Sequence, residues 1–229
     1  MPEISQTLLQ APMLRHLAPA DQDRMISAGV ERKLPSQQVL FHTGDRAEAV
    51  YILISGKLKL VRHTSQGKEL LLHLVSPGES FAEAAMLGNG TYPATAVSLE
   101  PSVVFCWPRS RLIELLRNTP DLALGMVLSV SLWTHRLVTQ LELLTQRRVE
   151  ERLAIYLKGR SGGERLVAGH EIILREPRNL IAAQIGTVPE VLSRTFRRFE
   201  ESGLVEITSN KVRILDADGF DALAEPIEM

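Results

Sequence analysis

A short basic stretch near the C-terminus holds the side chains best suited to chemistry, and that chemistry is hydrogen bonding to bases. Read with helical periodicity, residues 188–201 place Glu190, Ser193, Arg194 and Arg197 on one side and apolar side chains on the other. Arginine can donate two hydrogen bonds to guanine, glutamate can accept one from a cytosine amino group, and serine can bond a base or a phosphate. The pattern predicts a helix that enters the major groove of DNA.

A second short helix precedes this one, and a tight turn separates the two. Ile181 and Ile185 belong to a short apolar face that stops at Gly186, where a positive φ carries no steric cost. Thr187 is expected to cap the second helix, which begins with Pro189. The pair predicts a helix-turn-helix. An ordinary surface helix with solvated charges is the alternative for a lone basic helix, and the paired helix argues against it.

The residues that follow predict a β-hairpin, or wing. Residues 205–207 and 212–214 are short strands that flank the turn at 208–211. Lys211 in this turn is expected near phosphate, as is Arg178 at the start of the first helix, where the helix dipole favours an anion. The predicted DNA-binding residues are Arg178, Val188, Glu190, Ser193, Arg194, Arg197 and Lys211.

Residues 177–203 closely resemble the DNA-binding domain of the cyclic-AMP receptor/FNR (CRP/FNR) family of bacterial transcription regulators. Glu190, Ser193 and Arg194 stand where the FNR branch carries its E-x-x-S-R base-reading set. The resemblance implies a homodimer that reads double-stranded DNA at an inverted repeat such as TTGAT-N4-ATCAA. It also implies control by an effector, with RNA polymerase as a further partner.

Between residues 31 and 107 apolar side chains alternate with period two, and turn-forming residues break the pattern regularly. Many short strands at this spacing predict an antiparallel barrel or jelly roll. The order Gly44-Asp45, then residues 51–60, then residues 77–83 is similar to the family's cyclic-nucleotide-binding β-roll. The strand candidates are 39–45, 49–56, 57–63, 68–75, 94–101 and 102–107.

The resemblance also implies a ligand pocket in this β-roll. The cyclic-nucleotide branch carries a Glu for the ribose, matched here by Glu83, and an Arg-Ser pair for the phosphate, replaced here by Pro93-Ala94. Without a cation to pair the phosphate, cyclic AMP is not the expected effector. A helix cap or a neighbouring pair is the alternative role for Glu83. The predicted effector pocket comprises Phe81, Glu83 and Tyr92.

The stretch Phe81-Ala82-Glu83-Ala84 followed by Met86 is similar to the nitric-oxide-sensing branch of the family, which uses haem. Haem is therefore one effector hypothesis, and ligand-free activity or another small molecule are the alternatives. Haem needs an axial donor. Six histidines without distinctive spacing could supply it: His16, His42, His63, His73, His135 and His170. The single cysteine, Cys106, excludes an internal disulfide and a self-contained four-cysteine iron–sulfur cluster.

Residues 120–145 predict one long helix after a short one at 109–117. One apolar stripe alternates spacings of three and four, as a coiled-coil seam does. This stripe is the predicted dimer interface: Val127, Val130, Thr134, Leu137, Leu141 and Leu144. A second stripe is expected to pack on the β-roll: Leu124, Leu128, Leu132 and Val138. The alternative is a two-faced core helix of a monomer.

Length and charge agree with two modules joined by this helix. Residues 146–215 contain 13 Lys and Arg against 9 Asp and Glu, whereas residues 1–145 balance. The predicted class is α+β, with N-terminal helices and a β-roll at 1–108, the short and long helices at 109–145 and a winged helix-turn-helix at 146–229. The N-terminus shows no signal peptide, and the apolar run 122–133 is short for a membrane span. We expect a soluble, cytoplasmic protein with no membrane partner.

Two other functions compete with DNA reading. A cupin-like metal enzyme would need converging histidines and a carboxylate, and the sequence contains no His-x-His, HExxH, P-loop or nucleophile elbow. No catalytic or metal-binding residues are predicted, and no enzyme is expected. The other alternative is an adaptor with a degenerate DNA-binding domain, against which the intact Glu190, Ser193 and Arg194 argue.

Overall fold

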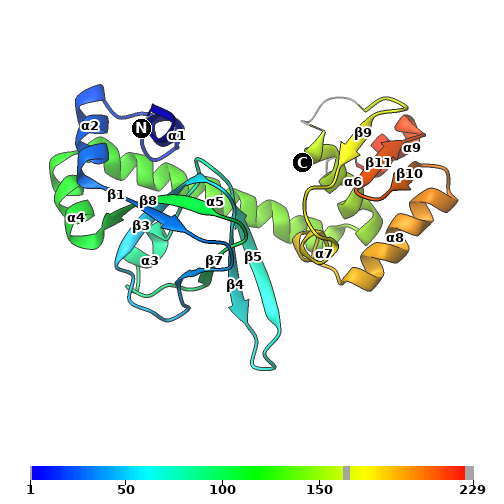
Figure 1. The fold of residues 1–229 in the computed structure, drawn as a ribbon, viewed down its shortest axis with the longest axis horizontal. Helices are drawn as coiled ribbons and strands as arrows, with labels where there is room; N and C mark the ends of the chain where they lie inside the picture. Colours follow the sequence, from blue (N-terminus) through cyan, green and yellow to red (C-terminus); the bar gives the residue numbers. More distant parts are fainter. Residues whose placement is uncertain (1, 162–165, 225–229) are drawn as a thin grey trace. The chain divides into compact units, whose positions relative to one another are not determined.

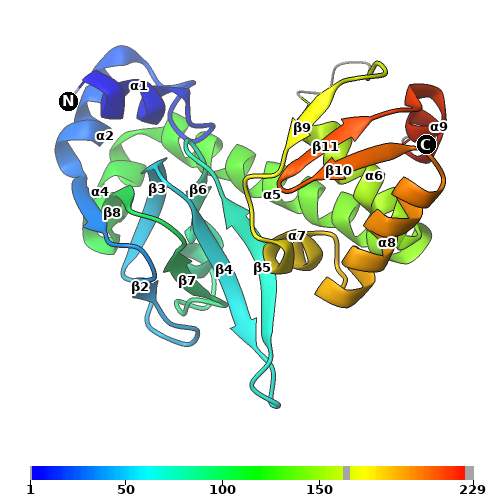
Figure 2. The same ribbon diagram turned by 45° about the vertical axis from the view of Figure 1, so that its right-hand side comes forward.

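Residues 2–161 and 166–224 are described in the computed structural model of the chain (Figures 1 and 2). They fall into two units, Met1–Arg136 and Leu137–Met229, and the boundary lies within one long helix. Each unit has its own buried apolar core, so each is described by itself.

Two four-stranded antiparallel sheets form the β-roll of the N-terminal unit, in the orders β1-β8-β3-β6 and β2-β7-β4-β5. The predicted jelly roll is therefore confirmed. β1 was not among the predicted strands because its sequence, VERKL, leaves all but the last residue exposed and shows no alternation. The strands are β1 (Val30–Leu34), β2 (Val39–Phe41), β3 (Ala49–Ser55), β4 (Leu58–His63), β5 (Glu69–Val75), β6 (Ser80–Phe81), β7 (Thr95–Ser98) and β8 (Ser102–Pro108).

Helices complete the core of this unit. The buried Trp107 of β8 donates its indole N–H to the Met25 carbonyl at 2.7 Å, which ties the second helix to the sheet. Gly125 permits the long helix to lie close to the backbone at Met13, because a Cβ at this glycine would lie 2.3 Å from the Met13 carbonyl oxygen. The helices are α1 (Pro2–Gln10), α2 (Pro19–Ala28), α3 (Glu83–Leu87), α4 (Arg109–Asn118) and α5 (Pro120–Gln146).

The second predicted stripe of α5 does not pack on the β-roll. Its members are between 37% and 59% exposed, and the side that is buried is instead formed by Leu122, Gly125 and Met126. Gly125 contacts the backbone at Met13, between α1 and α2, so this side of α5 is buried, and an apolar pattern on the helix alone cannot reveal this. The exposed residues are Leu124, Leu128, Leu132 and Val138.

The C-terminal unit packs helices on a three-stranded sheet of order β10-β11-β9. The first of these helices starts at Val149, because Arg148 is its N-cap, whose backbone N–H donates to Glu151 Oε2 at 2.8 Å. The last helix was not predicted. The elements are α6 (Val149–Arg160), β9 (Glu171–Ile173), α7 (Arg178–Gln184), α8 (Pro189–Glu201), β10 (Val205–Thr208), β11 (Lys211–Ile214) and α9 (Ala217–Leu223).

Candidate nucleic-acid interface and ligand pocket

The turn between α7 and α8 has the predicted glycine geometry but a different cap. Gly186 adopts a φ of 66°, which favours glycine. The Thr187 N–H donates to the Ala182 carbonyl at 2.8 Å, so this residue closes α7 and does not cap α8. The N-cap is Val188, which has no side-chain acceptor, and Pro189 opens the helix where a missing N–H does no harm. The prediction of Thr187 as cap was therefore wrong by one residue.

α8 separates a buried side from an exposed side, as its periodicity predicts. Its buried residues are Leu192, Thr195, Phe196 and Phe199. The predicted base-reading residues Glu190, Ser193, Arg194 and Arg197 are all exposed.

The exposed residues of α8 differ in their partners. Ser193 Oγ donates to the Pro189 carbonyl of its own helix at 2.9 Å. Arg197 Nε lies 2.9 Å from Glu201 Oε1 one turn further along. Among the described residues, no ion pair holds Glu190 or Arg194. These two side chains are therefore available to meet an external partner without breaking an internal salt bridge.

Arg178, a predicted phosphate contact, packs on α8. Its guanidinium carbon lies 4.0 Å from the centre of the Phe196 ring, a cation–π contact. Its Nη1 is buried and has no hydrogen-bond partner among residues 2–161 and 166–224. The Arg178 side chain thus packs α7 against α8. Any contact of Arg178 with DNA must come from its remaining exposed donors.

The wing carries cations that acidic residues already hold. Lys211 Nζ lies 2.9 Å from Glu171 Oε2, and Arg213 lies 2.9 Å from the other oxygen of the same carboxylate and 3.1 Å from Glu206. Hydrogen bonds from Arg213 and Lys211 keep the pKa of Glu171 below its ordinary value. The hairpin turns at Ser209, whose φ is 54°. A phosphate at this wing would compete with Glu171 for both cations.

The predicted dimer stripe of α5 is largely exposed in the single chain. Leu141 is 62% exposed and Val127 is 60% exposed. Val130 is the exception, since it is partly buried beside a cavity. Among the described helices α5 is also the one whose length and composition would suit a membrane span. The N-terminal part of α5 packs in the core of the N-terminal unit through Leu122 and Met126.

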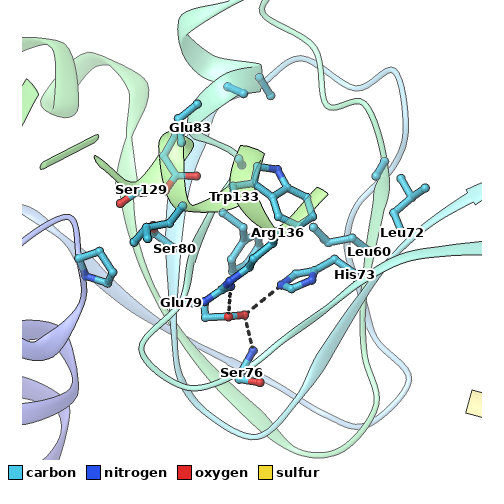
Figure 3. Close-up of a pocket in the computed structure, with 18 of the residues that line it drawn as sticks. Leu60, Leu72, His73, Ser76, Glu79, Ser80, Glu83, Ser129, Trp133 and Arg136 are labelled. Atoms are coloured by element: carbon cyan, nitrogen blue, oxygen red, sulfur yellow. Dashed lines mark hydrogen bonds and ion pairs between the residues drawn. The ribbon is translucent and has the colours of Figure 1, made fainter. Parts of the chain in front are cut away.

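A cavity of about 480 Å³ lies in the N-terminal unit between the β-roll, α3 and α5 (Figure 3). The three residues predicted for the effector pocket, Phe81, Glu83 and Tyr92, all line it, as does the Pro93-Ala94 pair. The predicted effector pocket did not include the side chains that α5 and β5 contribute, although His73 was among the candidate axial donors of haem. Those residues are His73, Trp133 and Arg136.

Glu79 binds the two basic side chains at the cavity, His73 and Arg136. His73 Nε2 and the Ser76 N–H each lie 3.0 Å from Glu79 Oε2, and Arg136 of α5 pairs with the other oxygen (Figure 3). Burial acts to raise the pKa of Glu79, but these hydrogen bonds and charges outweigh it and bring the pKa below its ordinary value. The network therefore joins β5 to the long helix around an ionised carboxylate.

Glu83 is a buried carboxyl group that lines the same cavity. It is 6% exposed and follows Ala82, whose φ of 78° is strained for a residue with a Cβ. Its Oε1 has no hydrogen-bond partner within the described part of the chain. Burial raises its pKa, although a hydrogen bond from Ser80 acts against this. Glu83 is not the N-cap of α3, which is Ala82, but its carboxyl group bonds Ser80 and its own backbone N–H, so the alternative of a local pair agrees with the structure.

Tyr92 contributes its ring more than its hydroxyl. The hydroxyl accepts from the Glu48 N–H at 3.1 Å and donates to the Ala49 carbonyl at 3.1 Å. The ring stacks on Phe41 with centroids 3.8 Å apart. Tyr92 therefore fixes the cavity wall rather than offering a polar group to a ligand.

The cavity offers haem a poor set of donors. His73 is the one histidine that lines it, its Nε2 is bonded to Glu79, and its ring lies 4.6 Å from Trp133 between centroids. An axial nitrogen would have to be released from this carboxylate first. Across residues 2–161 and 166–224, no three His, Cys, Asp or Glu side chains are grouped to hold a metal ion.

A β-roll with a cavity beside it, a long helix and a winged helix-turn-helix are the parts of a DNA-binding transcription regulator. Residues 31–119 match the family described as the cyclic nucleotide-binding domain, and residues 151–223 match the Crp-like helix-turn-helix domain. The chain belongs to the CRP/FNR family of transcription regulators.

Named relatives agree with this assignment. The chain is 32% identical to the transcriptional activator protein FnrA of Stutzerimonas stutzeri over 195 residues, 84% of this chain and 80% of that protein. It is 28% identical to the cyclic AMP receptor protein of Thermus thermophilus over 93% of this chain and 97% of that protein. The structure of FixK2 from Bradyrhizobium japonicum shares the fold, with a TM-score of 0.72 at 18% identity over 87% of this chain and 99% of that one.

Proposed function

We propose that this chain acts as a homodimer that binds an inverted repeat of the type TTGAT-N4-ATCAA and regulates transcription in the cytoplasm. Each subunit would place α8 in one of two successive major grooves, about one helical turn apart. The single observation that carries the proposal is the exposed face of α8. There Glu190, Ser193 and Arg194 project from a helix that Gly186 and a buried apolar side hold in place.

The long helix supplies a surface for pairing two subunits. Leu137 and Leu141 are 45% and 62% exposed, and exposed leucines at this spacing are typical of a coiled-coil seam. Burial of such side chains against a second copy would remove apolar area from water, which favours association. A two-fold pair of recognition helices then requires a palindromic site.

The β-roll cavity is the proposed effector site, and cyclic AMP is not the proposed effector. Pro93 and Ala94 line the cavity at the positions where the family carries a phosphate-binding pair. Arg136 and His73 are held by Glu79. An effector that binds one arrangement of α5 better than another would shift the population of DNA-binding dimers. RNA polymerase is a further proposed partner of the dimer on DNA.

Fluorescence anisotropy with labelled duplexes tests the proposal. The duplexes are the full TTGAT-N4-ATCAA repeat, a single half-site and a scrambled sequence of equal length. We expect the full repeat to bind about a thousandfold more tightly than the scrambled duplex at physiological salt, since specific sites exceed non-specific ones by this order or more. Equal affinity for the repeat and the scrambled duplex would overturn the proposed specificity, and equal affinity for the repeat and the half-site would overturn the dimer.

A further inference from the structure

The cavity of the N-terminal unit has an apolar wall that suits aromatic rings. Phe81 of β6, Trp133 of α5 and Leu60 of β4 line it from three separate elements. Figure 3 shows Trp133 and Leu60 on the cavity beside His73. A volume of about 480 Å³ lies within the range of pockets that bind small organic ligands. The wall therefore favours a ligand with a large apolar part.

The charges around the cavity disfavour an anion. Arg136 and His73 are the basic side chains among the described lining residues, and Glu79 binds both of them. A phosphate, sulfonate or carboxylate would have to displace Glu79 from its hydrogen bonds. It would then face the Glu79 carboxylate, whose pKa lies below its ordinary value. Like charges in a poorly solvated site repel strongly.

Glu83 supplies the polar feature that a ligand must match. Its Oε1 is buried and unpartnered within the described residues, and the side chain lines the cavity. Figure 3 labels Glu83 and Ser80, its hydrogen-bond partner, among the residues that line the cavity. An unpaired buried acceptor is costly, and a donor from a ligand would remove that cost.

We propose that the cavity binds an uncharged aromatic molecule whose N–H or O–H group donates to Glu83 and whose rings pack on Trp133 and Phe81. This inference rests on the proposed role of the β-roll as the effector site and names the chemical class of the effector. Such a ligand would contact α3, the β-roll and α5 together. It therefore bears on the helix that carries the proposed dimer seam.

Two fluorescent probes that share one ring scaffold test whether the cavity prefers an uncharged ligand to an anion. N-phenyl-1-naphthylamine is uncharged and has one N–H donor, and 8-anilinonaphthalene-1-sulfonate adds a sulfonate to the same rings. Titration of the full chain should give one site per subunit for the neutral probe. We expect the sulfonate to bind about tenfold or more weakly, because its charge must be buried beside the Glu79 carboxylate. Equal or tighter binding of the sulfonate would overturn the proposal.

Substitutions of cavity residues test whether the neutral probe binds in this cavity. Glu83→Leu removes the acceptor and should weaken the neutral probe about tenfold. Glu83→Gln keeps an oxygen acceptor, so it should hold the neutral probe. Ala94→Phe should block the cavity and abolish binding, whereas Glu114→Gln on the exposed face of α4 should change nothing. Unchanged binding in Glu83→Leu and Ala94→Phe would contradict the assignment.

Competition and DNA binding separate this inference from the proposed function. Cyclic AMP should not displace the neutral probe, and displacement by cyclic AMP, or by haem with a Soret band, would overturn the inference. DNA binding is measured on the same samples with the inverted repeat. If the neutral probe does not bind but the protein still binds the inverted repeat specifically, the proposed ligand class is wrong and the proposed function stands. If the neutral probe binds but the protein does not recognise the repeat, the proposed function is wrong and the ligand class stands.

Discussion

Gly186 and Leu144 pack so closely that a Cβ on the glycine would lie 2.2 Å from Leu144 Cδ2. The turn of the helix-turn-helix thus rests on the last part of α5, within the C-terminal unit. Leu144 remains 43% exposed and belongs to the proposed dimer seam. One leucine therefore contacts the DNA-reading motif on one side and presents apolar surface on the other.

Replacing Gly186 should reveal this contact. Gly186→Ala places a Cβ at a positive φ, which costs about 1–2 kcal/mol in the free energy of unfolding, and it also forces Leu144 to move. Gly203→Ala is the matched control, since Gly203 has a φ of 72° but nothing within 4 Å of the added Cβ. Urea unfolding should show a larger loss for Gly186→Ala. Equal losses would mean that the Leu144 contact contributes nothing.

A charge placed in the α5 stripe should separate the subunits. Leu141→Glu puts a carboxylate at a position that the proposed dimer buries, and we expect a monomer by light scattering with weak binding to the full repeat. Thr139→Glu is the control, because Thr139 is exposed and lies about 200° around the helix. A Leu141→Glu protein that stays dimeric would exclude this seam.

Removing the acid that holds the wing cations should strengthen DNA binding. Glu171→Gln releases Lys211 to meet phosphate, whereas Arg213 keeps its pair with Glu206, and we expect a gain of roughly threefold on both specific and scrambled duplexes, with a steeper salt dependence. Glu69→Gln makes the same change of charge at the Lys59 pair of the β-roll and should have no effect. A loss of affinity in Glu171→Gln would show that this carboxylate positions the wing.

Two glutamates of the cavity should affect stability with opposite pH dependence. The folded state raises the pKa of Glu83, so it binds more protons than the unfolded chain and stability falls as the pH rises above about 4.5. Glu83→Gln should therefore raise the Tm, and the gain should grow as the pH rises from about 4.5 toward the raised pKa of the folded state.

Glu79 behaves in the reverse way because its pKa is lowered in the folded state. Its contribution is present above about 4.5 and is lost as the pH falls through the lower folded value. Glu79→Gln should lower the Tm at neutral pH, with a difference that shrinks on acidification. The same sign of pH dependence in both variants would contradict the assigned protonation states.

Local patterns predicted the DNA-reading motif well, whereas contacts between distant segments escaped prediction. Gly186 and the periodicity of α8 lie within one short stretch, so the sequence alone locates the turn and the exposed face. The Glu79 network joins His73 and Arg136, which lie six and 57 residues away along the chain. No spacing rule links such positions, because the folded β-roll brings them together.

Arg194 is proposed to read the guanine of the TTGAT half-site, and a double-mutant cycle tests this contact most directly. Wild type and Arg194→Ala are each titrated with the TTGAT repeat and with a repeat that carries adenine in place of that guanine. We predict that wild type discriminates between the duplexes by about 1–3 kcal/mol and that Arg194→Ala does not, because the bidentate contact is gone. If Arg194→Ala loses the same affinity for both repeats and keeps the discrimination, Arg194 does not read this base and the account is wrong.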